Sequence, residues 1–175
     1  MPKIGRVTRL ALALVAAIAT TPSFVVRGDT QIGAFKVRGG VLADATRAFG
    51  VPSSVRKKNG SECTVTWRRR GLTILFLSLE RRDPCNTGFL VLGTTTSTRW
   101  TTAAGLRIGN AATPARVHAA YPKAVYQQKQ WPNTGWWLVM RKYCELGGNA
   151  PYPGLLARVS NGRISALVVQ VGVCE

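Results

Sequence analysis

Acidic residues and histidine are scarce in this sequence of 175 residues. It contains seven Asp and Glu in total, and His118 is the one histidine. Nucleophilic catalysis needs a base beside the nucleophile, and His118 stands beside Val117 on a predicted helix, where packing explains it better than chemistry. Paired carboxylates would serve glycoside hydrolysis, but most of the acids stand beside cations or at predicted turns. The sequence therefore predicts no catalytic residue, with an exported hydrolase that uses Glu62 as the alternative.

The sequence also lacks the spacings of metal and phosphate sites. No two of the four cysteines are two to four residues apart, and His118 has no nearby thiol, so a zinc site is excluded. The glycine pairs Gly39-Gly40 and Gly147-Gly148 lack the spacing and the lysine of a phosphate-binding loop. We therefore expect no metal and no cofactor.

Long hydrophobic runs are missing except at the start, where Leu10–Ala19 is uninterruptedly apolar. Ten residues are too few to span a bilayer, which takes roughly 20. The cations Lys3, Arg6 and Arg9 precede the run, and small residues end it, which is the order of a cleavable secretory signal over residues 1–19. The alternative is an uncleaved anchor. No cysteine stands near the cleavage site, which argues against a lipid anchor.

An internal repeat organises the rest of the chain. Each copy begins with a short apolar strand, continues with a helix and ends with a strand, a turn and a second strand. The matching segments are Ala34–Val37 and Gly105–Ile108, then Leu42–Phe49 and Pro114–Tyr121, then Thr64–Leu77 and Leu155–Val169. The second copy has an additional predicted hairpin, Val125–Trp131 with Trp136–Met140.

From this repeat we predict an α+β fold of two tandem helix-plus-antiparallel-hairpin modules packed together, after the N-terminal signal peptide. The expected divisions are a signal peptide at 1–19, an N-terminal extension at 20–32, module 1 at 33–92, a Thr-rich linker at 93–104 and module 2 at 105–175.

The four cysteines, Cys63, Cys85, Cys144 and Cys174, all follow the predicted signal. An even number in an exported chain favours disulfides. Three pairings are possible, and we favour Cys63–Cys85 with Cys144–Cys174 because each bond then stays within one copy of the repeat. On the chain-entropy model each would contribute roughly 3–4 kcal/mol. A secreted or extracytoplasmic location follows from these bonds and from the signal.

The duplicated order of elements resembles the β-lactamase inhibitory proteins and the small outer-membrane assembly lipoproteins that carry a single such module. The shared features are the strand starts at Phe35–Gly39 and Leu106–Gly109, the helix ends at Phe49-Gly50 and Tyr121-Pro122, and the hairpin that follows each. The resemblance implies two tandem helix–sheet modules and a non-enzymatic, protein-binding role. The inhibitory proteins present a carboxylate from the first hairpin, whereas this chain has three arginines there, so the resemblance does not extend to the inhibited enzyme.

The excess of positive charge is large and evenly spread. Removing Lys3, Arg6 and Arg9 from the 24 basic residues leaves 21 against seven acids, a net charge of +14. Such a charge favours encounters with anionic partners. Arginine clusters bind carboxylate and phosphate, and exposed tryptophans beside them are typical of binding hot spots. The candidate binding residues are Arg68, Arg69, Arg70, Arg81, Arg82 and Trp137.

We therefore predict a secreted, non-enzymatic binding protein whose basic, tryptophan-bearing sheet recognises an acidic protein or an anionic cell-envelope polymer. Nucleic acid is a possible partner that the sequence does not favour. A structural, envelope-associated domain whose charge serves only general adhesion is a further alternative.

Overall fold

The computed structural model describes residues 24–78, 83–86, 90–128, 134–142 and 151–171. Among them, 50% lie in strands and 14% in helices. In chain order the elements are β1 (Val25–Arg27), β2 (Gln31–Ile32), β3 (Phe35–Lys36), α1 (Leu42–Phe49), β4 (Ser54–Lys58), β5 (Glu62–Trp67), the 3-10 helix η1 (Arg68–Arg70), β6 (Leu72–Leu77), β7 (Leu90–Thr95), β8 (Thr101–Thr102), α2 (Pro114–Ala120), β9 (Val125–Gln127), β10 (Gly135–Lys142), β11 (Pro151–Ser160) and β12 (Arg163–Val171).

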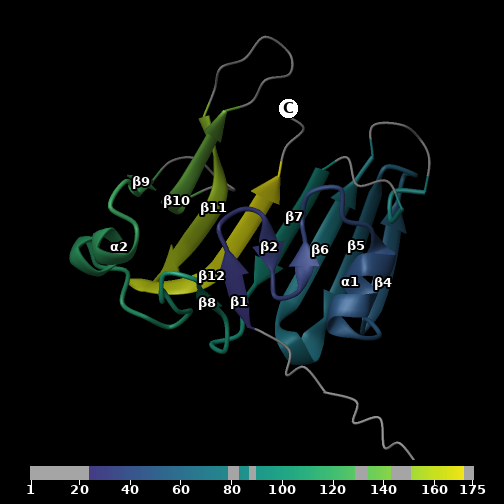
Figure 1. Ribbon diagram of the computed structural model, residues 1–175, viewed down its shortest axis with the longest axis horizontal. Coiled ribbons are helices and arrows are strands. Elements are labelled where there is room, and N and C mark those ends of the chain that lie inside the picture. Colours follow the sequence, from purple (N-terminus) through teal and green to yellow (C-terminus); the bar gives the residue numbers. More distant parts are fainter. Residues whose placement is uncertain (1–23, 79–82, 87–89, 129–133, 143–150, 172–175) are drawn as a thin grey trace, which may run out of the picture.

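The strands form two sheets (Figure 1). The large sheet has the order β4-β5-β6-β7-β12-β11-β10-β9, and all of its neighbouring strands are antiparallel. The small sheet has the order β3-β2-β1-β8. Strand β7 pairs with both β6 and β12, so a single sheet runs through residues from both halves of the chain.

The predicted α+β fold of helix-plus-hairpin modules is wrong. The protein is mostly β, with large antiparallel sheets and two α-helices in the described residues. Two of the strands that were not predicted, β4 and β7, were missed for identifiable reasons. Strand β4 lies at an edge and is rich in cations, so it has no apolar alternation. Strand β7 includes the start of the Thr-rich stretch expected to be a linker, and threonine, being β-branched, is itself a good strand former. The division of the chain into two modules stays a prediction.

Several local predictions are confirmed. Helix α1 has the predicted bounds, and α2 begins at Pro114 after Thr113, whose side chain accepts a hydrogen bond from the Arg116 backbone N–H. The hairpins β5–β6, β9–β10 and β11–β12 all form. Asn161 and Gly162, at the tip of β11–β12, both have positive φ, as a tight hairpin turn requires.

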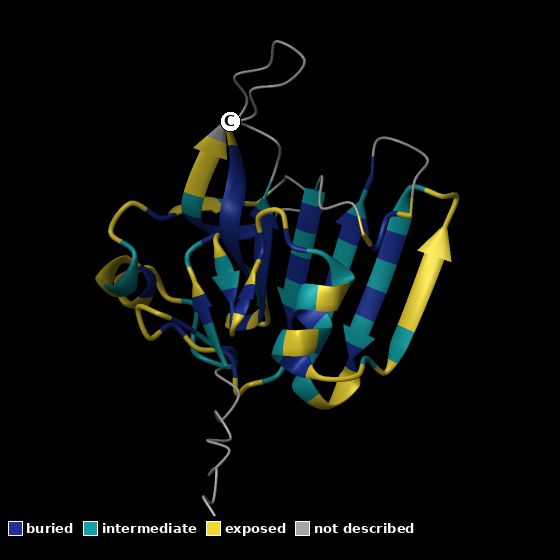
Figure 2. Cartoon of the chain, turned by 45° about the vertical axis from the view of Figure 1, so that its right-hand side comes forward, coloured by how far each residue is buried: buried dark blue, intermediate teal, exposed yellow. Residues whose placement is uncertain are grey.

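The main core lies on one face of the large sheet, beneath α1 and the small sheet (Figures 1 and 2). Phe49, at the end of α1, stands edge-to-face with Trp67 of β5 at 5.4 Å between ring centroids. Phe35 of β3 meets Phe76 of β6 in the same way at 6.4 Å. Burial of these rings from both layers holds the helix and the small sheet on the large sheet.

The opposite face carries a second, smaller apolar cluster of Trp137, Leu156 and Val168, with Leu92 packed against it. Successive strand residues point to opposite faces, so Trp136 joins the main core while Trp137 joins this cluster. Both tryptophans are buried, at 7% and 2% exposed. Trp137, named above as a candidate binding residue, is therefore buried in this structure.

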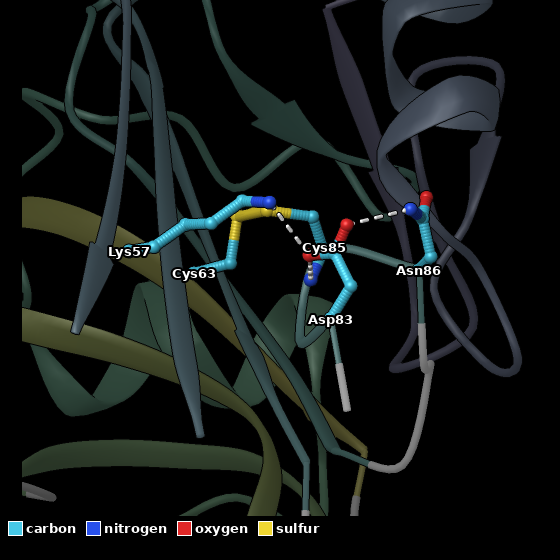
Figure 3. Close-up of polar contacts among 5 residues, drawn as sticks. All are labelled: Lys57, Cys63, Asp83, Cys85 and Asn86. Carbon is cyan, nitrogen blue, oxygen red and sulfur yellow. Dashed lines mark hydrogen bonds and ion pairs between the residues drawn. A yellow bond between two sulfur atoms is a disulfide. The ribbon is translucent and has the colours of Figure 1, made fainter. Parts of the chain in front are cut away.

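The Cys63–Cys85 disulfide is confirmed, with 5.2 Å between the two Cα atoms (Figure 3). It indicates an oxidising, extracytoplasmic compartment. Cys144 and Cys174 lie outside the described residues, so their pairing stays a prediction. Within the part of the chain that the structure describes, no helix is both long and apolar enough to cross a membrane.

Candidate anion-binding site

The three consecutive arginines form η1, the turn between β5 and β6. Gly71 ends the turn with φ of 57°, a left-handed conformation that glycine adopts without a steric penalty. A Cβ added at Gly71 would also lie 2.7 Å from the Ser97 backbone nitrogen. Together with a hydrogen bond from the Thr96 N–H to the Gly71 carbonyl, at 2.8 Å, this close approach places η1 against the segment after β7.

Two arginine side chains are held in place at this junction. The Arg70 Nε donates to the Phe49 carbonyl at 3.0 Å, and its guanidinium carbon lies 5.8 Å from the ring centroids of both Phe24 and Phe49. The Arg99 guanidinium lies 4.4 Å from the Phe24 centroid and donates from Nη2 to the Arg69 carbonyl. Cation–π contacts and backbone hydrogen bonds therefore orient both groups before any ligand arrives.

These residues surround a depression of about 340 Å³. Except for one serine, each residue that lines it carries either a positive charge or an apolar side chain. We call it the arginine pocket, and its lining residues are Phe24, Phe49, Val51, Ser53, Trp67, Arg69, Arg70 and Arg99. Val51 is 87% exposed, which leaves an apolar surface in the open at the rim. The volume is at the lower end of the range for ligand pockets, so it suits one side chain or one small anionic group.

Two tryptophans, Trp67 in the lining of the pocket and Trp100 behind it, form hydrogen bonds with backbone carbonyls. The Trp67 indole donates to the Gly50 carbonyl at 2.8 Å, and the Trp100 indole donates to the Arg70 carbonyl at 2.7 Å. Trp100 is fully buried and stands edge-to-face with Phe24, at 5.0 Å between centroids. The hydrogen bond from Trp100 thereby holds the backbone of η1 on the same aromatic cluster that contacts the Arg70 and Arg99 guanidinium groups.

No carboxylate in the described residues pairs with Arg69, Arg70 or Arg99. The ion pairs found there lie elsewhere in the molecule and join Arg47 to Asp44, Lys57 to Asp83 and Arg141 to Asp29. The arginine pocket therefore combines three positive charges, two of them on oriented side chains, with no carboxylate partner among the described residues. This arrangement favours an anionic ligand.

The structure brings together part of the predicted binding surface. Arg69 and Arg70 line the pocket, while Arg68 belongs to the same turn and is exposed but does not line it. Arg81 and Arg82 lie outside the described residues. Trp137 is buried and belongs to the second apolar cluster, so it does not contribute to this surface.

The residues considered for catalysis do not assemble. His118 is exposed on α2, where Nδ1 lies 3.3 Å from the Pro122 carbonyl and the ring meets Trp136 edge-to-face. Glu62 lies on β5, directly opposite Lys58 of β4. Within the described ranges, no three His, Cys, Asp or Glu side chains come together in a group that would hold a metal ion.

Sequence reasoning missed Phe24, Phe49, Val51 and Arg99 as members of a site. Their positions in the chain are far apart, and only the long-range packing of β1, α1 and the segment after β7 against η1 brings them together. One local signal was present, since Arg99 directly precedes Trp100.

Comparison of the chain with protein-family models, with curated proteins and with solved structures gives no match.

Proposed function

We propose that this protein is a secreted, non-enzymatic binding protein that recognises an acidic protein through the arginine pocket. The observation that carries the proposal is the orientation of Arg70 and Arg99, whose guanidinium groups are held by aromatic rings and backbone carbonyls. Arginines that serve solubility alone need no such support. Orientation in advance lowers the entropy lost when a ligand binds, so it strengthens binding.

An acidic protein fits the pocket better than a bare polyanion. The walls and rim carry Phe24, Phe49 and Val51, which offer apolar contact beside the charges. Protein hot spots combine aromatic and arginine side chains in this way. An anionic envelope polymer would use the charges but would leave the apolar rim in water.

The experiment measures retention on immobilised poly-glutamate over a series of salt concentrations. Reversing two pocket charges with R69E/R99E should weaken binding more than tenfold and flatten its dependence on salt, because charge-assisted hydrogen bonds to carboxylates contribute about 1.5–3 kcal/mol each. The matched control is R116E/K123E, which makes the same change in net charge at exposed positions in and after α2.

If both double variants lose binding equally, the effect is one of overall charge and the proposal is wrong. If polyphosphate binds as tightly as poly-glutamate and with the same dependence on Arg69 and Arg99, the partner is an anionic polymer and not an acidic protein.

A further inference from the structure

Strand β4 is the terminal strand of the large sheet. It pairs with β5 in an unbroken register from Ser54 opposite Thr66 to Lys58 opposite Glu62, and no other described strand pairs with it. Four of its five residues are exposed, including Val55 at 43%, and the strand stands free at the margin of the sheet in Figure 2. An edge of this kind presents backbone N–H and C=O groups to any chain that can lie beside it.

The charges on β4 are arranged by face. Arg56 and Lys58 lie opposite Thr64 and Glu62, on the face turned away from the main core. Lys57 points to the other face, where its ammonium lies 2.9 Å from the Asp83 carboxylate (Figure 3). Hydrogen bonding from Lys57 lowers the pKa of Asp83, which keeps this pair charged. Arg56 and Lys58 stand two residues apart on one face, both are exposed, and Glu62 lies opposite Lys58. No ion pair found among the described residues involves either cation.

These cations act in opposite ways on different partners. A second copy of the chain that paired edge to edge would bring like charges together, which is unfavourable. An extended segment with acidic residues at alternate positions would instead set a carboxylate against each cation. The edge is thus repulsive toward itself and attractive toward an acidic strand.

The start of β4 adjoins the arginine pocket. The chain reaches β4 through Val51 and Ser53, both of which line the pocket. The Ser53 hydroxyl accepts a hydrogen bond from the Arg68 N–H at 3.0 Å, so η1 and the beginning of β4 are directly connected. A segment lying along β4 would therefore reach the pocket at the Ser54 end.

We propose that β4 accepts an acidic, extended segment of the partner protein as an additional strand of the large sheet, with one carboxylate of that segment bound in the arginine pocket. The inference rests on the proposed function and adds the conformation of the ligand. Backbone hydrogen bonds to an open edge supply affinity in this mode of recognition, and alternate side chains supply specificity.

The probe is an end-blocked peptide of eight residues that alternates Glu and Val. Its control is the same sequence with every second backbone nitrogen methylated, which keeps the charge and removes ladder donors. The unmodified peptide should bind at least tenfold more tightly, and hydrogen exchange of residues 53–58 should slow when it binds. The R56E/K58E variant should lose most of this binding, whereas R116E/K123E should keep it.

Equal affinity of the two peptides, or exchange that slows only at residues 68–71 and 96–99, would overturn the added strand while leaving the pocket intact as a site. The added strand would also be overturned if R69E/R99E lost all peptide binding while R56E/K58E kept full binding, because the pocket alone would then account for the affinity. A further outcome is that R56E/K58E binds the peptide normally but self-associates. That result would show that the cations serve only to protect the edge, and would also refute the inference.

Discussion

Breaking the Cys63–Cys85 disulfide should destabilise the protein by an amount that depends on the length of the loop that the bond closes. The bond closes a loop with a sequence separation of 22 residues, for which the chain-entropy model gives about 3.4 kcal/mol at 25 °C. Cys63 and Cys85 are 0% and 1% exposed, so the folded protein shields the bond. For a domain of this size the loss corresponds to a fall in Tm of about 7–14 °C.

The assay is urea unfolding of a C144A/C174A background, in which Cys63–Cys85 is the one remaining cysteine pair. Samples are compared with the bond oxidised and after reduction in denaturant, so that no side chain is truncated between the two states. The reduced form should have the lower midpoint and also a steeper denaturant dependence, because its unfolded chain is less restricted and exposes more surface. Identical midpoints would refute the assignment of this loop as a stabilising constraint.

The bond also connects to the site. The Cys85 carbonyl accepts the Leu42 N–H at 2.8 Å, which fixes the start of α1. At the other end of α1, Phe49 supplies a wall of the arginine pocket and the carbonyl that holds Arg70. Reduction should therefore weaken poly-glutamate binding even under conditions in which the protein stays folded.

Three further predictions concern single residues. D29N should cost about 1–2 kcal/mol at pH 7, because the largely buried Asp29 accepts two hydrogen bonds from Arg141 and the exposed side of that guanidinium is screened by water. Burial opposes ionisation of Asp29, but the hydrogen bonds from Arg141 outweigh burial and lower the pKa of Asp29 below its ordinary value of 3.8. The wild type should therefore have the larger unfolding free energy at neutral pH, and its difference from D29N in urea titrations should disappear as the pH falls below 3.8. W137A should lower the unfolding free energy by about 3–5 kcal/mol and leave the poly-glutamate affinity of the folded protein unchanged, because Trp137 is buried. A loss of affinity without a loss of stability would show instead that Trp137 belongs to the binding surface. G71A should lower the unfolding free energy by about 1–2 kcal/mol, because alanine is strained in the left-handed backbone conformation of Gly71. It should also weaken poly-glutamate binding, because the turn that carries Arg69 and Arg70 must shift away from Ser97, and normal binding would contradict that geometry.

The parts of the fold that depend on neighbouring residues could be predicted from the sequence. Helix α1 follows from the apolar spacing of Ala45 and Phe49, and the β11–β12 hairpin follows from Asn161-Gly162. In each case the signal lies within a few residues of the structure that it specifies.

The parts that depend on distant residues could not. Pairing of β7 with β12 joins Thr94 to Val168, and nothing near either residue indicates the other. The burial of Trp137 has the same origin, since it packs against Leu156 and Val168 on the face opposite the main core. The arginine pocket forms only where Arg70 and Arg99 come together over Phe24, which is distant from both in the sequence. Only Arg69 and Arg70 could be predicted, because they belong to a run of consecutive arginines.

The arginine side chains themselves offer the most direct test of anion recognition. NMR of the arginine Nε–Hε groups during titration with poly-glutamate should show saturable shifts for Arg70 and Arg99, with Arg107 and Arg116 unchanged. Shifts of similar size at all exposed arginines, or at none in the pocket, would contradict the assignment of the arginine pocket as the binding site.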